Sequence, residues 1–242
     1  MQRLTLGDSV AVTPPKKILF PVAYQDWKRV AFIHWRYPIA VVQGLLPDGL
    51  RVDPFDGDAW VTLSPFVVER LRAPGMPALF PPYLETNLRT YVIGPDGSRG
   101  ILFLALDATA AAPVVLGRAL YFQPYIRSSL GVEGLRYMGE RQPSGDRYDV
   151  ELGAGARLVE QTPLDTFLTG RWIFYTFYGG IPAAAFVEHE PWPLQRARVL
   201  ACEETFTRAA GLPAPAEEPI AHYAELVHAK LSMPRPILRR AS

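Results

Sequence analysis

A predicted hairpin over residues 85–107 constrains the fold of this chain more than any other stretch. Its first strand covers 85–92, a Gly-Pro-Asp-Gly turn follows at 94–97, and the second strand begins at Ile101. That second strand is apolar on both faces, which is typical of a strand covered on both sides, so the hairpin is expected to lie deep in the fold. Because side chains alternate along a strand, one face of the first strand carries four hydrogen-bonding residues: Glu85, Asn87, Arg89 and Tyr91. Such a row lines either solvent or a polar cavity, and the expected burial favours the cavity.

Short strands and turns account for most of the remaining sequence. Residues 30–37 and 171–178 are rich in aromatic and β-branched side chains and are predicted strands. A second hairpin is predicted over 51–68, through a turn at 56–58, and a last strand is predicted near 226–231. The predicted helices are short, and proline or turn residues set their bounds: 39–46, 110–122 and 162–168.

Proline and glycine mark the breaks between these elements. The segment 73–82 contains four prolines and cannot be regular structure, so we predict a flap or rim over the mouth of the fold. Gly153-Ala154-Gly155 is predicted to be a turn between two strands. We find no repeat and no shift in composition that would mark a second domain. The chain is therefore predicted to be one antiparallel or mixed β domain, closed or nearly closed: residues 1–242, with an irregular lead-in at 1–25, the β domain at 26–235 and a tail at 236–242.

Composition excludes several classes of protein and partner. The 242 residues carry 25 basic and 24 acidic side chains, a net charge of +1, so no global field attracts nucleic acid or an anionic membrane. No apolar run approaches the roughly 18 residues of a membrane-spanning helix. Asp8 and the break at Pro14–Lys17 argue against a signal peptide. The single cysteine, Cys202, rules out an internal disulfide, so we expect a cytoplasmic protein.

Three charged residues are the main candidates for a site. On the second predicted helix Arg118 and Tyr121 share a stripe, and Tyr125 lies just past its end. A charge buried on a strand is costly unless it is paired, so we predict that Glu85 and Arg89 pair with each other near Arg118. This cluster is either a structural ion-pair network or a polar pocket that presents guanidinium groups to a small anionic or carbonyl ligand. The sequence leaves both alternatives open.

A wider set of residues surrounds this cluster. His34 and Arg36 share a face of the predicted strand 30–37, and their side chains could reach the same pocket. The candidate ligand-binding residues are therefore Glu85, Asn87, Arg89, Tyr91, Arg118, Tyr121, Tyr125, His34 and Arg36. No catalytic residue is assigned.

Metal and cofactor signals are missing from the sequence. The four histidines are far apart and Cys202 is the only thiol, so no metal site is expected. No glycine-rich nucleotide- or phosphate-binding motif occurs, and no cofactor is expected. The sequence favours His34 and His189 as core histidines bonded to backbone. His189-Glu190 is either an acid–base pair or part of an exposed turn.

Six groups of residues are spread over about positions 30–235. They are His34-Trp35; Leu45-Leu46-Pro47 with Gly49-Leu50; Phe55-Asp56-Gly57 with Ala59-Trp60-Val61; Asn87–Val92; Phe167-Leu168-Thr169 with Arg171; and His189–Leu194. Together they resemble the YqjF-like proteins, a bacterial family of unknown function grouped with proteins of acetoacetate-decarboxylase-like fold. The resemblance implies a mainly β (α+β) fold, a single cone-shaped β-barrel around a small-molecule cavity, with a few short helices.

The similarity to acetoacetate decarboxylase itself covers two segments. Tyr83–Glu85 resembles the stretch that carries the active-site glutamate of that enzyme, and Gly117–Pro124 resembles the segment that leads to its catalytic lysine. In the decarboxylase that lysine forms a Schiff base and is activated by a cationic neighbour. Here Tyr125 follows the segment, and no lysine occurs between Lys28 and Lys230. Schiff-base decarboxylation is therefore not expected.

These observations predict a polar pocket that binds a small carboxylate or keto compound without Schiff-base decarboxylase activity. The alternative is a non-catalytic binding or accessory protein whose buried charge cluster is structural. Whether the protein is an enzyme stays open. The expected partner is a small-molecule ligand rather than nucleic acid or a membrane, and a homo-oligomer is left open.

Overall fold

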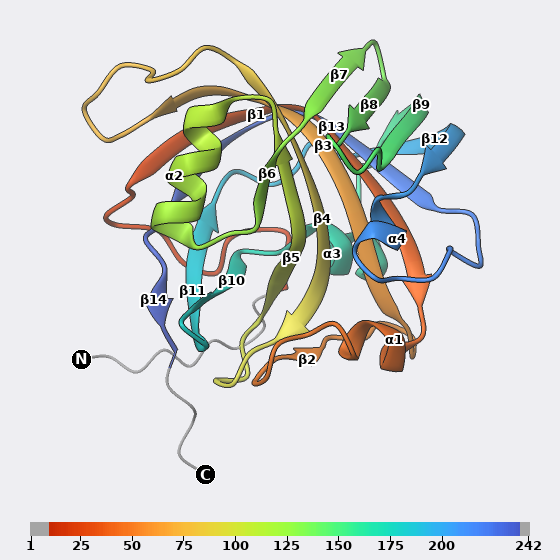
Figure 1. Cartoon of the computed structure of the whole chain (residues 1–242), viewed down its shortest axis with the longest axis horizontal. Coiled ribbons are helices and arrows are strands. Elements are labelled where there is room, and N and C mark those ends of the chain that lie inside the picture. The colour runs from red at the N-terminus through yellow and green to blue at the C-terminus, as the bar shows by residue number, and fades with distance from the viewer. Residues whose placement is uncertain (1–9, 238–242) are drawn as a thin grey trace.

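The computed structural model describes residues 10–237, about half of which lie in β-strands (Figure 1). The strands in this part of the chain are β1 (Ala23–Tyr37), β2 (Arg51–Val52), β3 (Ala59–Arg72), β4 (Tyr83–Ile93), β5 (Arg99–Ala108), β6 (Tyr125–Arg127), β7 (Ser129–Glu133), β8 (Arg136–Glu140), β9 (Arg147–Arg157), β10 (Ile173–Tyr178), β11 (Ile181–Glu188), β12 (Gln195–Glu204), β13 (Ile220–Leu231) and β14 (Arg235–Pro236). The helices there are α1 (Ile39–Gln43), α2 (Ala111–Tyr121), α3 (Pro163–Thr169) and α4 (Phe206–Ala209).

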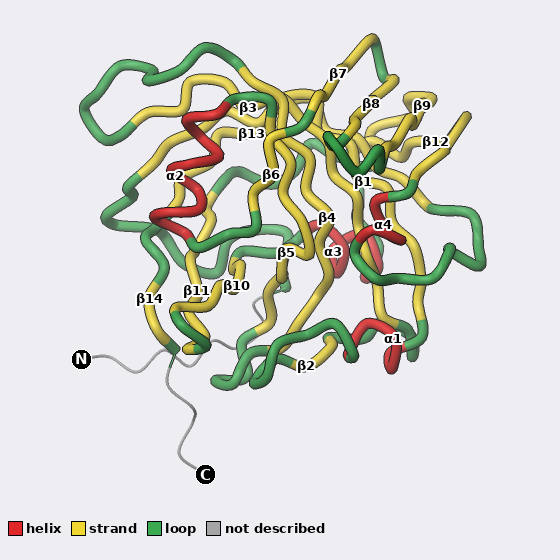
Figure 2. The backbone as a smooth tube through the Cα atoms, viewed as in Figure 1, coloured by secondary structure: helices red, strands yellow, loops and turns green. Residues whose placement is uncertain are grey.

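One sheet contains all of these strands. Its main path runs β14-β11-β10-β5-β4-β3-β1-β13-β12-β9-β8-β7. Most neighbours are antiparallel, but β5 pairs in parallel with both β10 and β6, so the sheet is mixed. Strands β11 and β13 are far apart along this path and nevertheless pair directly, with Val187 opposite Leu231. The long strands curve, as the backbone trace shows (Figure 2). The prediction of a mainly β fold is confirmed.

The β4–β5 hairpin lies at the centre of the sheet, between β3 and β10. Glu85 pairs with Ala108 and Arg89 with Phe103, with a shift in register just before Arg89. The extra residue belongs to β5, so β4 keeps its regular alternation. Leu88 packs into a core cluster on one side of the sheet, whereas Tyr91 packs with Phe167 on the other side. The predicted hairpin and its two faces are confirmed.

The predicted helices are present with small changes at their ends, and α4 is an addition that the sequence did not predict. Local hydrogen bonds explain where α3 begins. The backbone N–H of Asp165 donates to Thr162 Oγ1 at 3.1 Å, and the N–H of Thr162 donates to Asp165 Oδ2 at 2.9 Å. This reciprocal cap, with Pro163 in the first turn, fixes the start of the helix. No helix within residues 10–237 is long and apolar enough to cross a membrane.

The predicted turn at Gly153–Gly155 is wrong, because these residues lie inside β9. A β-carbon on Gly155 would lie 2.0 Å from the carbonyl oxygen of Arg196 on β12. The glycine is therefore needed for close approach of two strands where their register shifts, and not for a reversal of the chain.

Other boundaries also differ from the predictions. The turn within 51–68 forms, since Asp56 and Gly57 have positive φ, but it closes only an isolated Phe55–Asp58 bridge while β2 pairs with β4. Strand β13 begins at Ile220, because it pairs with β1 along nearly its whole length. Strand β1 starts inside the predicted lead-in 1–25. Of that lead-in and of the tail 236–242, residues 1–9 and 238–242 lie outside the described part of the chain.

Candidate functional site

A cavity of about 370 Å³ lies beside the β4–β5 hairpin. Side chains from β1, β3, β4, β5, β10 and β11 form its walls, together with α2. The loop 73–82 adds Ala73, Leu79 and Phe80 to the wall, so it borders the same space as Glu85. The lining is mostly apolar, with large aromatic side chains: Trp27, Phe32, Phe66, Phe103, Phe174 and Trp192. A cavity of this size and character lies in the range of small-molecule sites.

One face of β4 supplies a polar row to this cavity. Its members alternate along the strand and are each less than a tenth exposed: Tyr83, Glu85, Asn87 and Arg89. Tyr91 continues the row but is fully buried and does not border the cavity. The alternation that predicted four polar residues on one face thus places three of them, Glu85, Asn87 and Arg89, against the cavity.

Glu85 is held by a tyrosine from the segment after α2. The hydroxyl of Tyr125 donates a hydrogen bond to Glu85 Oε2 at 3.1 Å. The ring of Tyr125 packs so closely on α2 that a β-carbon on Gly117 would lie 2.3 Å from it. Burial raises the pKa of the Glu85 carboxyl to about 7; the bond from Tyr125 opposes this shift and the charge of Asp107 adds to it. The site therefore holds a carboxyl group that exchanges its proton near neutral pH.

Arg89 carries a buried positive charge with no acidic partner among the described residues. Its Nη2 donates to the carbonyl oxygen of Leu168 at 3.3 Å, and its guanidinium carbon lies 5.2 Å from the ring centre of Phe32. The predicted pair between Glu85 and Arg89 is wrong. Four residues of extended strand separate their Cα atoms by roughly 13 Å, so the two side chains share a face without touching.

Several polar atoms around the cavity have no hydrogen-bond partner within the described chain. There are five such buried side-chain atoms, and four of them belong to residues that line the cavity: Asn87 Oδ1, Arg89 Nε, Tyr121 OH and Arg171 Nη2. Buried polar groups are normally satisfied, so a concentration of unsatisfied ones requires an explanation. These four atoms share a position at the cavity wall, which distinguishes this region from the rest of the described chain.

Arg171 is a lining residue that the sequence did not assign to the site. Its Nη1 donates to Asp53 Oδ2 at 2.6 Å, and its Nε donates to the carbonyl oxygen of Phe167 at 2.8 Å. Burial lowers the pKa of its guanidinium to about 10, partly offset by the charge of Asp53. Arg89 and Arg171 thus bind consecutive carbonyl oxygens at the end of α3. Nothing in the sequence marks Asp53 and Arg171 as partners, because 118 positions separate them.

The prediction that Arg118 floors the pocket is wrong. Arg118 lies on the exposed side of α2, and its Nε donates to the carbonyl oxygen of Tyr125 at 2.7 Å. Arg36 is also outside the cavity, where it approaches Asp58 at 3.9 Å and lies over the ring of Trp60. The two tyrosines predicted to accompany Arg118, Tyr121 and Tyr125, do line the cavity.

His34 and Tyr91 belong to a buried hydrogen-bonded chain beside the cavity. His34 Nδ1 lies 2.7 Å from Thr62 Oγ1, which lies 2.6 Å from the hydroxyl of Tyr91. That hydroxyl donates at 2.8 Å to the same Leu168 carbonyl that Arg89 binds. On the other side of the ring, His34 Nε2 lies 3.2 Å from Nδ1 of His222, whose Nε2 lies 2.8 Å from Asp165 Oδ1. The chain therefore connects α3 with β1, β3, β4 and β13. His34 is a core histidine, although its partners are side chains and not backbone.

His189 borders the cavity between aromatic rings. It is 4 % exposed, and its Nδ1 lies 2.5 Å from the carbonyl oxygen of Glu190, as expected of a core histidine bonded to backbone. Its ring packs on Trp172 and Trp192, with centroids 4.6 and 4.4 Å away. Burial lowers its pKa to about 4. The Glu190 carboxylate bonds His228 instead, so the two neighbours do not form an acid–base pair.

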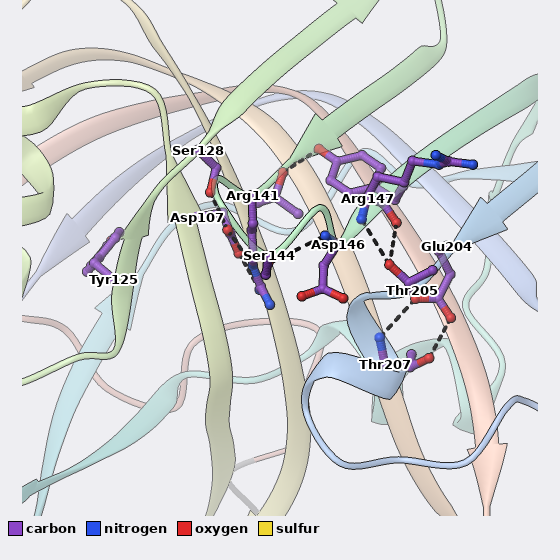
Figure 3. A network of polar contacts seen from close by, with 12 residues as sticks. Asp107, Tyr125, Ser128, Arg141, Ser144, Asp146, Arg147, Glu204, Thr205 and Thr207 are labelled. Atoms are coloured by element: carbon purple, nitrogen blue, oxygen red, sulfur yellow. Dashed lines mark hydrogen bonds and ion pairs between the residues drawn. The ribbon is translucent and has the colours of Figure 1, made fainter.

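The buried charge of Asp107, away from the cavity, is fully paired. Asp107 accepts hydrogen bonds from Arg141 Nε at 2.8 Å, from Arg141 Nη2 at 2.6 Å and from Ser128 at 2.6 Å. Figure 3 shows both partners pointing toward Asp107, with Tyr125 apart from them. Arg141 also lies 3.9 Å from the ring centre of Phe206. This cluster is saturated and joins β5 to the end of β8, in contrast to the incomplete bonding around the cavity.

Comparisons with known proteins place this architecture. The family model DUF2071, described as an uncharacterized conserved protein, matches residues 24–228. The chain is 32% identical over 216 residues to the uncharacterized protein YqjF of Bacillus subtilis (strain 168), and the match covers 83% of this chain and 86% of that protein.

Solved structures show the same fold at low sequence identity. The acetoacetate decarboxylase from Legionella pneumophila superposes with a TM-score of 0.63 and 13% identity, covering 100% of both chains. The enduracididine biosynthesis enzyme MppR complexed with pyruvate gives a TM-score of 0.59 and 14% identity, over 94% of this chain and 95% of that one. At this identity the similarity shows the fold alone. The expected acetoacetate-decarboxylase-like fold is confirmed.

Proposed function

This chain belongs to the DUF2071 family of YqjF-like uncharacterized proteins, so its function has to be inferred from the site. We propose that the cavity beside β4 binds a small carboxylate or keto compound. The observation that carries the proposal is Arg89, a buried cation that borders the cavity without an acidic partner in the described chain. An isolated buried charge is strongly unfavourable, and an anionic ligand would compensate it. The similar enzyme MppR is known in complex with pyruvate, which is compatible with such a ligand.

We further propose that the sheet forms a closed, cone-shaped barrel and that the chain is a single domain around it. The pairing of β11 with β13 supports closure, since it links two ends of a path that also contains β10, β5, β4, β3 and β1. The same strands supply most of the cavity walls. The loop 73–82 then serves as part of the rim at the end where Tyr83 and Glu85 lie.

The proposed activity does not use a Schiff base. That chemistry needs a neutral amine inside the cavity, and none of the described lining residues is a lysine. Lys28 pairs with Glu69 at 2.8 Å and Lys230 pairs with Glu188 at 2.8 Å, both on partly exposed side chains. Lys16 and Lys17 precede β1. Glu85, Tyr125 and Tyr121 remain as groups that could move protons on a bound carbonyl compound.

Thermal unfolding in the presence of small carboxylates tests the proposal. A ligand that binds only the folded state raises Tm, by an amount set by its concentration relative to Kd. We expect carboxylates to raise Tm of the natural protein and to have little effect on Arg89→Met. Arg141→Met is the matched control, because it alters a buried arginine outside the cavity. No rise with any carboxylate, or an equal rise in Arg89→Met, would contradict the proposal.

A second candidate is a binding or accessory protein in which the buried charges are purely structural. The saturated Asp107–Arg141 pair favours a structural role for those two residues. The unpartnered atoms of Asn87 and Arg89 do not fit it, since a structural network would satisfy them.

A further inference from the structure

The cavity has two different polar ends on one strand, with apolar walls between them. Arg89 marks a cationic end; Arg171, which binds the neighbouring carbonyl oxygen of α3, also borders the cavity. Glu85 marks the other end, with Tyr125 bonded to one of its oxygens. The Cα atoms of Glu85 and Arg89 are roughly 13 Å apart, since β4 is regular between them. A molecule that binds both ends must therefore be elongated.

The walls of the cavity along this row carry aromatic side chains that suit an aromatic ring of a ligand. Phe66 pairs across the strands with Glu85, and Phe103 pairs with Arg89, so an aromatic side chain flanks each end of the row. Trp27 packs edge-on against Phe66 at 5.8 Å, and Phe103 contacts Phe174 at 5.6 Å between ring centres. Flat apolar walls of this kind favour an aromatic body, through stacked and edge-to-face contacts.

The volume excludes a compact acid as the molecule that fills the site. About 370 Å³ is within the range of cavities that hold drug-sized ligands, whereas a keto acid such as pyruvate has only six heavy atoms. Pyruvate could neutralise Arg89, but it would leave the aromatic walls and Glu85 without contacts.

The Glu85 end selects a neutral hydrogen-bonding group. Tyr125 occupies Oε2, and no other hydrogen bond to this carboxyl exists within the described residues. The raised pKa allows it to be protonated near pH 7, so it can donate as well as accept. A hydroxyl group can both accept from a protonated Glu85 and donate to an ionised one, and it carries no charge into the apolar surroundings.

From these features we infer that the natural ligand is an arylalkyl carboxylate with a distal hydroxyl group, its carboxylate at Arg89 and its hydroxyl at Glu85. The inference rests on the proposed carboxylate site and names the class of its ligand. Asn87 lies midway along the row, beside the body of such a molecule.

Isothermal titration of the 242-residue protein with three probes tests this inference: pyruvate, 3-phenylpropanoate and 3-(4-hydroxyphenyl)propanoate. Burial of the ring should make 3-phenylpropanoate bind more than tenfold tighter than pyruvate, since each buried carbon contributes substantially. The 4-hydroxyl should tighten binding further, by about 2- to 10-fold, which is the usual net effect of one added hydrogen bond.

The variant Glu85→Met separates the hydroxyl contact from the rest of the site. In it the affinity for 3-phenylpropanoate should stay within about threefold, while the gain from the hydroxyl disappears, because its buried partner is lost. Tyr125→Phe serves as a second variant if Glu85→Met does not fold, and it should reduce the same gain by releasing the Glu85 side chain. The comparison of pyruvate with 3-phenylpropanoate needs no variant.

The outcomes distinguish the inference from the proposal beneath it. If pyruvate binds as tightly as 3-phenylpropanoate, or if the hydroxyl gain persists in the Glu85 variant, the ligand class is wrong while the carboxylate site stands. If no probe binds, or if Arg89→Met leaves all affinities unchanged, the carboxylate site itself is wrong and the inference falls with it.

Discussion

Two buried arginines in this fold should respond in opposite ways to the same substitution. Arg141 makes a two-point contact with Asp107, and both side chains are at least nine-tenths buried. Arg141→Met would leave the Asp107 carboxylate buried and bonded only by Ser128, a loss that costs about 3–5 kcal/mol. Arg89 has no acidic partner in the described chain, so Arg89→Met removes an uncompensated charge. Replacing a whole buried ion pair by apolar side chains of similar volume is often neutral or stabilising by about 1–4 kcal/mol, and removing a charge that has no ionic partner should lie at the stabilising end of that range.

Little else is lost when Arg89 is replaced. The Leu168 carbonyl keeps its hydrogen bond from Tyr91 at 2.8 Å, so no buried acceptor is left unsatisfied. Methionine preserves much of the volume against Phe32 and fills irregular apolar space well. The contact between the guanidinium and the Phe32 ring is worth about 0.5–2 kcal/mol. Losing this contact reduces the stability gained by removing the charge, but over most of the expected range it does not reverse the gain.

Urea unfolding, followed by tryptophan fluorescence, measures both effects. The midpoint should fall for Arg141→Met and rise for Arg89→Met at unchanged m, which identifies a change in stability and not in compactness. In a thermal scan each kcal/mol corresponds to about 2–4 °C in Tm at this chain length. If Arg89→Met destabilises the protein as much as Arg141→Met, Arg89 has an anionic partner within the fold and the argument for a ligand anion is wrong.

Three further measurements address the Glu85 end of the cavity. Since the pKa of Glu85 is raised to about 7 on folding, the folded state binds more protons between about pH 4.5 and 7, and stability should fall by up to about 3 kcal/mol as pH rises through that window. Glu85→Gln should abolish this slope, and the difference between the two proteins removes the opposing effect of His189. Gly117→Ala forces the Tyr125 ring away and should weaken the binding of carboxylates with a distal hydroxyl. Gly131→Ala serves as the neutral control, because the added β-carbon would meet only the flexible Met138 side chain, at 3.4 Å. Borohydride with acetoacetate or pyruvate should leave the intact mass unchanged, and an adduct on a lysine would show that a Schiff base does form.

The sequence predicted the central hairpin because its signals are local. Alternation, an apolar partner strand and a Gly-Pro-Asp-Gly turn all lie within about 25 residues, and each follows from the geometry of strands. The failures concern contacts between distant segments. Nothing near Gly155 indicates that the Arg196 carbonyl will approach it, so a glycine that permits packing was interpreted as a turn. Nothing near Arg51 indicates that β2 will pair with β4 and not with the next strand.

The same distinction explains the site. Glu85, Asn87 and Arg89 could be predicted because one strand carries them, and Tyr121 and Tyr125 because one helix and its end carry them. Arg118 was wrongly assigned to the pocket, because the stripe that it shares with Tyr121 does not indicate which side of the helix faces the sheet. Arg171 could not be assigned, since its role depends on Asp53, 118 positions away. His189 was predicted as a core histidine bonded to backbone, but its place on the cavity depends on packing against Trp172 and Trp192.

Burial alone therefore does not identify a functional charge in this fold; the state of its partners does. Asp107, Arg141, Asp53 and Arg171 are as buried as Arg89, and each has a carboxylate or guanidinium within 3 Å. A fold can retain such pairs without any other molecule, because each charge is compensated by its partner. Arg89 lies on the central strand, where a hydrophobic residue would pack at lower cost, and its positive charge is compensated by nothing in the described chain. An uncompensated buried charge destabilises the ligand-free protein, and a bound anion would compensate it. The cavity, and not the ion-pair network, is therefore the place to search for function.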